Sequence, residues 1–128
     1  MLENIACLSF SSKMNNQDVQ TLVEDATLDF TLGDNEEAIK KLEQAININS
    51  QSFQAWHALA EVYYSDKFFD RALQAAEKAY ALSPKDIHIN TSLSRIWMEL
   101  GDKTTAEKFG AQARMLNWKD DLQSPQNK

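Results

Sequence analysis

Three residues of the chain, His57, Glu61 and His88, have side chains that could do chemistry together. His57 and Glu61 are four residues apart, so a helix would place both on one face. The chain also has a 34-residue repeat, described below, and its geometry would bring His88 of the next repeat alongside them. Two imidazoles and a carboxylate could bind zinc or act as a base. Isolated His and Glu side chains are common on polar helix faces, however, and no HExxH spacing supports a metal. A metal site at this trio is therefore the less favoured hypothesis.

No other set of residues points to catalysis. The sequence contains no glycine-rich phosphate loop and no nucleophile elbow. Cys7 is the single cysteine, and it lies in a stretch where no preorganised base would activate its thiol. A single cysteine also excludes an internal disulfide and a thiol cluster for a metal. We expect a protein that is not an enzyme and that needs no cofactor.

The composition is that of one folded, mainly helical domain. The chain has 128 residues, of which 43% are hydrophobic, with three Gly and two Pro. No apolar run approaches the roughly 18 residues of a membrane span, so we expect no membrane insertion. The segment from Met1 to Lys13 lacks the features of a secretion signal, which predicts a cytoplasmic location. Met14 is an alternative start.

The formal net charge of -6 is concentrated near the beginning of the chain. Residues 19–52 hold seven acidic residues against Lys40 and Lys41, a net of -5, whereas residues 87–120 hold five basic residues against four acidic ones. Binding to nucleic acid requires a concentrated basic surface, and the most polarised region here has the opposite sign. The charge distribution therefore predicts no nucleic-acid partner. The acidic stretch is either a solvated helix surface or a docking site for a basic partner.

Residues recur in matched registers every 34 positions, and most of them are small. Small residues at this interval are typical of a repeated pair of stacked helices, because alanine allows two helices to approach closely. The matched sets are Gly33, Lys67 and Gly101; Ala38, Ala72 and Ala106; Ala45, Ala79 and Ala113; and Ile48, Leu82 and Leu116.

Capping and helix-breaking residues predict six helices in three hairpins. The caps are Asn16 or Asp18 for the first helix, then Asp34, Ser52, Asp86 and Asp102, while Pro84 blocks continuation of the fourth helix. The expected helices end near residues 32, 48, 65, 82, 100 and 116. We expect the remaining tail to fray, apart from Trp118, which would fold back onto the last helix.

The middle repeat, residues 53–86, resembles a tetratricopeptide repeat (TPR). Its matching positions are Trp56, Leu59, Ala60, Tyr63, Ala72, Ala79 and Pro84. The repeats 19–52 and 87–120 match less fully, since Asp29 replaces the Tyr of the middle repeat and Trp118 takes the place of its Pro. The resemblance implies an all-α, right-handed superhelical stack of three helix-turn-helix hairpins over residues 17–118. Residues 1–16 would form an N-terminal arm with an optional short helix, and residues 119–128 a flexible tail.

The resemblance further implies a non-catalytic function, the binding of a peptide or protein segment in a concave groove lined by the first helix of each hairpin. The groove positions implied for this sequence are Phe30, Gln54, His57, Glu61, Tyr64, His88, Thr91, Arg95 and Met98, with Gln20, Val23, Thr27, Thr31 and Glu99 beside them. Relatives that clamp the acidic tail of heat-shock chaperones would need Lys, Arg or Asn where Val23, Thr27, Ala58, His88 and Ser92 stand. We do not expect that specificity here.

An alternative is a structural or assembly role through uncovered ends of the stack. Phe109, Ala113 and Leu116 are expected on the outer side of the last helix, with no obvious cover. Exposed apolar ends of stacked repeats favour pairing, so a homodimer is the competing expectation. At the other end, Leu2, Ile5, Ala6 and Phe10 have approximate helical spacing and would lie over the first hairpin.

Overall fold

The structure is a computed structural model that describes residues 15–123. Every regular element within this range is an α-helix. The helices are α2 (Asn15–Thr31), α3 (Asn35–Ile48), α4 (Phe53–Ser65), α5 (Phe69–Leu82), α6 (Ile87–Glu99) and α7 (Lys103–Gln123). The expectations for Cys7, for the N-terminal arm before residue 15 and for the choice between Met1 and Met14 lie outside the described residues.

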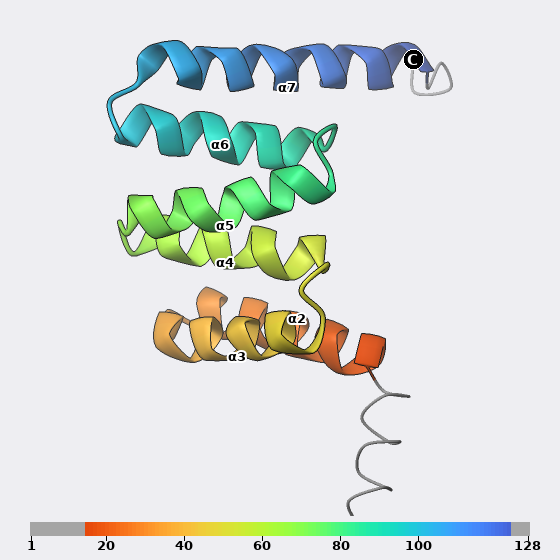
Figure 1. The fold of residues 1–128 in the computed structure, drawn as a ribbon, viewed down its shortest axis with the longest axis vertical. Coiled ribbons are helices and arrows are strands. Elements are labelled where there is room, and N and C mark those ends of the chain that lie inside the picture. Colours follow the sequence, from red (N-terminus) through yellow and green to blue (C-terminus); the bar gives the residue numbers. More distant parts are fainter. Residues whose placement is uncertain (1–14, 124–128) are drawn as a thin grey trace, which may run out of the picture.

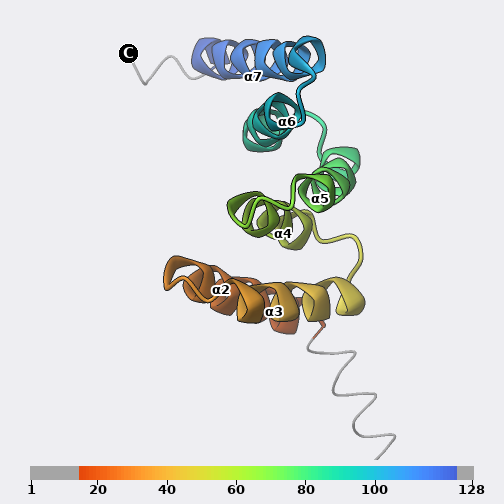
Figure 2. The same ribbon diagram turned by 90° about the vertical axis from the view of Figure 1, so that its left-hand side faces the viewer.

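The helices form three hairpins, α2 with α3, α4 with α5, and α6 with α7, stacked in chain order along the long axis of the molecule (Figure 1). Helix α4 contacts both α2 and α3 of the hairpin before it, and α6 contacts α4 and α5 in the same way. The predicted all-α stack of three helix-turn-helix hairpins is confirmed. In the perpendicular view, α4 and α6 lie to the same side of α5 (Figure 2).

Each hairpin turns at the same repeat position, with the backbone in the left-handed region. The φ angles are 89° at Gly33, 66° at Lys67 and 92° at Gly101. In each turn the following residue donates its backbone N–H to the carbonyl five positions back, as Phe68 does to Tyr63 over 2.9 Å. These bonds satisfy helix-end carbonyls that would otherwise lack a partner. These three residues therefore recur 34 positions apart because each adopts the left-handed backbone conformation that the hairpin turn requires.

The predicted capping residues are confirmed at four helix starts. The side chains of Asp34, Ser52, Asp86 and Asp102 each accept a hydrogen bond from the backbone N–H three residues further on. These bonds satisfy amide groups that the first helical turn leaves free. Helix α2 begins at Asn15, before both of its predicted caps.

The recurring alanines form the interior of the stack. Ala38, Ala45, Ala72, Ala79 and Ala106 are fully buried. Larger apolar side chains, including Leu42, Leu59, Leu93 and Ile96, fill the space between the hairpins. The close approach that the spacing predicts is thus present at each hairpin.

Helix α7 is longer than expected. It runs to Gln123, past the predicted end near Leu116, and extends beyond the N-terminal end of the antiparallel α6 (Figure 1). The expectation of a fraying segment is wrong for residues 117–123, because this stretch contains no helix breaker and Pro125 is the first. Trp118 does not fold back, since 63% of its surface is exposed.

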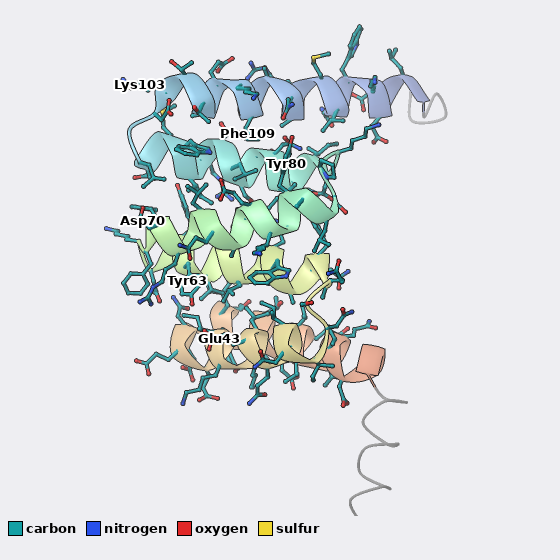
Figure 3. All side chains as sticks on the ribbon, viewed as in Figure 1. Glu43, Tyr63, Asp70, Tyr80, Lys103 and Phe109 are labelled. Atoms are coloured by element: carbon teal, nitrogen blue, oxygen red, sulfur yellow. The ribbon has the colours of Figure 1, made fainter. Side chains whose placement is uncertain are left out.

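The expectation of an uncovered apolar face at Phe109, Ala113 and Leu116 is also wrong. Ala113 is buried, Leu116 is half-buried, and the Phe109 ring packs edge-on against Tyr80 with ring centroids 5.5 Å apart (Figure 3). Helix α7 packs against α6, and its Phe109 ring reaches Tyr80 of the hairpin before it, so these side chains face the stack.

The outer faces of the stack are instead partly polar. In α7, Glu107 and Arg114 form an ion pair of 2.6 Å at the repeat positions where α5 has Leu73 and Tyr80, which are partly buried and pack against the core. In α2, the exposed Asp25 takes the position of the buried Leu59. Stacking another hairpin on either face would bury these charged groups, which is costly.

Candidate functional site

The helices α2, α4 and α6 are the first helices of the three hairpins, and residues 34 positions apart occupy the same place on each of them. Thr27, Glu61 and Arg95 form one such row, each 34 residues from the next. We call the surface formed by these three helices the α2–α4–α6 face. Because the hairpins stack in register, side chains of one row meet across neighbouring helices.

Glu61 is the centre of a polar cluster on this face. Its carboxylate accepts hydrogen bonds from Arg95 Nη2 at 3.1 Å and 3.0 Å and from Ser92 Oγ at 2.5 Å. His57 Nε2 lies 3.2 Å from Ser92 Oγ and 3.6 Å from Glu61 Oε2. The negative charge of this half-buried carboxylate on α4 is thereby balanced by Arg95, and the carboxylate is held in place by groups from α4 and α6.

The surroundings of Glu61 favour its charged form. Burial alone would raise the pKa of this carboxyl, but the adjacent His57 and Ser92 donors and the Arg95 charge outweigh burial and lower the pKa to about 2. Glu61 is therefore ionised throughout the neutral range.

Aromatic contacts extend the cluster toward the ends of α4 and α6. The Arg95 guanidinium lies over the Tyr64 ring at 5.0 Å from its centroid, and Tyr64 Oη donates a long hydrogen bond of 3.5 Å to Glu99. Burial, followed by the nearby Glu99 charge, raises the pKa of Tyr64. The Tyr64 ring also packs edge-on against Phe69, which fixes its position.

A polar pocket of about 240 Å³ opens between α4 and α6. It is lined by His57, Glu61, His88, Thr91, Ser92 and Arg95. No group of three His, Cys, Asp or Glu side chains between residues 18 and 122 is arranged to hold a metal ion. The His57, Glu61 and His88 side chains are thus not arranged as a metal site in this structure, and the Glu61 carboxylate is instead engaged by Arg95 and Ser92.

An apolar pocket of about 210 Å³ lies on the other side of Glu61, between α2 and α4. Its lining residues are Ala26, Thr27, Phe30, Leu42, Ala58, Glu61 and Val62. Because Glu61 lines both pockets, the polar and apolar pockets are adjacent on one face.

The structure brings together many of the residues named from the sequence. His57, Glu61, His88, Thr91 and Arg95 line the polar pocket, Tyr64 contacts Arg95, and Phe30 lines the apolar pocket. Gln54 and Met98 line neither pocket, and Met98 is 54% exposed.

Ser92 is the contributor that sequence reasoning missed. Ser92 is buried and touches His57, Glu61 and Arg95, although in the sequence it stood out only as a position that lacks a basic residue. The signal that could have found it is its spacing of 35 residues from His57 and 31 from Glu61, close to the repeat length.

None of the helices between residues 15 and 123 is both long and apolar enough to cross a membrane.

Comparison with known proteins identifies the repeats. A family model described as TPR repeat matches residues 28–67, and one described as Tetratricopeptide repeat matches residues 53–86. No curated protein sequence matches the chain.

Solved structures share the fold. A crystal structure of MamA is 24% identical, covers 81% of this chain and superposes with a TM-score of 0.77, and the chain spans only 61% of MamA's length. The first TPR of Spaghetti (RPAP3), bound to the HSP90 peptide SRMEEVD, is 20% identical over 78% of this chain and 79% of its own, with a TM-score of 0.76. The Yersinia enterocolitica Type III Secretion Translocator Chaperone SycD is 16% identical over 78% of this chain and 76% of its own, with a TM-score of 0.74.

The two family models, the 34-residue period and the stacked hairpins agree with one another. Residues 28–86 therefore contain tetratricopeptide repeats, and α6 with α7 continues the same stack of hairpins.

Proposed function

We propose that the chain is a non-catalytic interaction module that binds a peptide or protein segment in a concave groove on the α2–α4–α6 face. The observation that carries the proposal is the pair of adjacent pockets, one polar and one apolar, that share Glu61. An extended segment lying across the three helices would meet both, with Tyr64, His57 and Arg95 offering aromatic and hydrogen-bonding contacts. Interfaces of this kind combine an apolar anchor with polar surroundings.

The family supports this class of function, because TPR proteins are generally non-catalytic interaction modules. A structural neighbour, the first TPR of Spaghetti, is bound to a peptide that carries two Glu and an Asp. Its identity of 20% makes it evidence for the fold alone. In this chain Arg95 is already paired with Glu61, so it is not a free cation for a carboxylate ligand. We therefore propose a partner other than an acidic tail.

The test is to capture partners from an extract with the wild-type chain and with two variants. Tyr64→Ala with Arg95→Glu disrupts the α2–α4–α6 face. Arg114→Glu is the matched control, because Arg114 is also an exposed arginine paired with a glutamate but lies on the outer face of α7. We expect a partner that is lost with the groove variant and kept with the control. A partner that both variants retain at wild-type levels would contradict the proposal.

A second candidate is an assembly role through the end of α7. Met115, Trp118 and Leu122 follow the helical period there and are 61%, 63% and 59% exposed. Pairing of two chains through this stripe would bury it. Light scattering at several concentrations distinguishes the candidates: a mass that halves when residues 117–128 are removed supports assembly, and an unchanged monomer mass contradicts it.

The cytoplasmic location, the lack of a nucleic-acid partner and the lack of enzymatic activity remain predictions from the sequence and the family.

A further inference from the structure

The apolar pocket between α2 and α4 has two short side chains at its rim, Thr27 and Ala58. One repeat further along, the equivalent positions are Glu61 and Ser92, which are bonded to each other and to Arg95 and line the polar pocket between α4 and α6. The pocket between α2 and α4 thus differs from the neighbouring pocket in its mainly apolar lining.

The pocket has the size and floor of an anchor site for a single side chain. Its volume of about 210 Å³ is below the roughly 300–1,000 Å³ typical of small-molecule sites. The buried side chains of Ala26, Leu42 and Val62 are among its lining, which makes its floor apolar. An apolar side chain that enters it would leave water without losing hydrogen bonds of its own.

The charge around the pocket selects the neighbours of that side chain. Within Asn15–Thr31, Phe53–Ser65 and Ile87–Glu99, Arg95 is the only Lys or Arg, and it is paired with Glu61 at 3.0 Å. The same three helices carry six carboxylates, of which Asp25 lies on the outer face, Asp29 is paired with Lys41 at 2.7 Å and Glu61 is paired with Arg95; the other three are Asp18, Glu24 and Glu99. Glu24 is exposed one turn before Thr27, in the same repeat row as Ala58. A partner with acidic residues would be repelled here, and one with basic residues attracted.

We propose that the pocket receives one apolar side chain of a partner segment whose neighbouring residues are Lys or Arg. The inference rests on the proposed function and names the chemistry of the partner.

The experiment is a selection of phage-displayed random peptides of about 12 residues on the immobilised chain. Parallel selections use Ala58→Leu, which fills the pocket from its rim, and Thr27→Leu, which fills it from α2. Thermal melting checks that both variants fold. We expect the wild-type chain to enrich peptides that contain Leu, Ile, Met or Phe beside Lys or Arg, and a synthetic copy of the leading peptide to bind the filled variants about tenfold more weakly, equivalent to about 1.4 kcal/mol.

A matched pair of charge variants tests the second half of the inference. Glu24→Gln lies on the α2–α4–α6 face, and Asp25→Asn is the adjacent residue on the outer face. We expect the peptide to bind Glu24→Gln a few-fold more weakly and Asp25→Asn unchanged, since a single exposed charge is screened by water and contributes modestly to binding.

Several outcomes overturn the inference: acidic or uncharged enriched peptides, equal binding to the filled variants, or no enrichment over the filled variants. The proposed function fails separately, when partners captured from an extract are unaffected by Tyr64→Ala with Arg95→Glu.

Discussion

At the scale of single residues, Glu61 organises the candidate site. A half-buried carboxylate is stable on α4 because Arg95 and Ser92 of α6 donate to it and His57 lies beside it. These contacts join two consecutive hairpins, so they also fix the relative position of α4 and α6. The pairing of Glu61 with Arg95 was predictable in principle, because opposite charges stand one repeat length apart. The choice of side-chain conformation that includes Ser92 and His57 was not, because it depends on packing.

The pKa of Glu61 predicts how stability depends on pH. This pKa is about 2 in the folded chain against a usual 4.5, so the Glu61 contribution is fully present above pH 4.5 and is lost as pH falls toward 2. The Glu61→Gln variant has no carboxyl group at this position, so it cannot show this pH-dependent loss of stability. Urea unfolding at several pH values between 6 and 3 should show a smaller loss of unfolding free energy for Glu61→Gln than for the wild type. Other shifted acids, such as Asp102, are common to both proteins and cancel; equal losses would contradict the shift.

At the scale of the elements, the hairpins depend on turns and on small residues. The register of Gly33, Lys67 and Gly101 allowed the three turns to be predicted, and caps such as Ser52 allowed the helix starts to be predicted. The length of α7 was not predicted, because its end was expected near Leu116, the repeat position of Leu82, although Trp118 replaces the proline that follows Leu82. A tryptophan leaves the backbone N–H free to continue a helix, whereas a proline does not.

Lys67 is the residue whose backbone is strained. Its φ of 66° lies in the left-handed region that glycine adopts at the two equivalent turns. Lys67→Gly should therefore raise the free energy of unfolding by about 0.5–1 kcal/mol, less the entropy that glycine gains in the unfolded chain. Gly33→Ala is the reverse control and should lower the free energy of unfolding, because φ is 89° at this position. No atom lies within 4 Å of the added Cβ, so the loss would come from the backbone conformation and not from a clash. Chemical denaturation of the two variants measures both effects; a destabilised Lys67→Gly would refute the strain.

Because some alanines of a helix are buried and others are exposed, the effect of an Ala→Leu substitution on the free energy of unfolding should depend strongly on its position. Ala79 of α5 is fully buried, whereas Ala81, two residues later, is exposed. Ala79→Leu should reduce the free energy of unfolding by about 1–3 kcal/mol because the enlarged side chain separates the packed helices. Ala81→Leu should change it by less than about 0.5 kcal/mol. Similar effects of the two substitutions in thermal unfolding would show that close helix contact at Ala79 is not required.

At the scale of the whole molecule, three hairpins build one continuous face from α2, α4 and α6, with polar groups on both outer ends. Asp25 at one end and the Glu107–Arg114 pair at the other disfavour simple extension of the stack by another hairpin. The sequence predicted the stack but misjudged its last helix as apolar on the outside. Helical period alone does not say which of two neighbours a side chain faces, and Phe109 packs on Tyr80.

The most direct test of the proposed groove is a titration of the ¹⁵N-labelled chain with the leading peptide from the selection, monitored by amide chemical shifts. The account predicts that the perturbed amides cluster in α2, α4 and α6, around Thr27, Glu61 and Arg95. Perturbations confined to α7 around Trp118, or to α3 and α5, would contradict it.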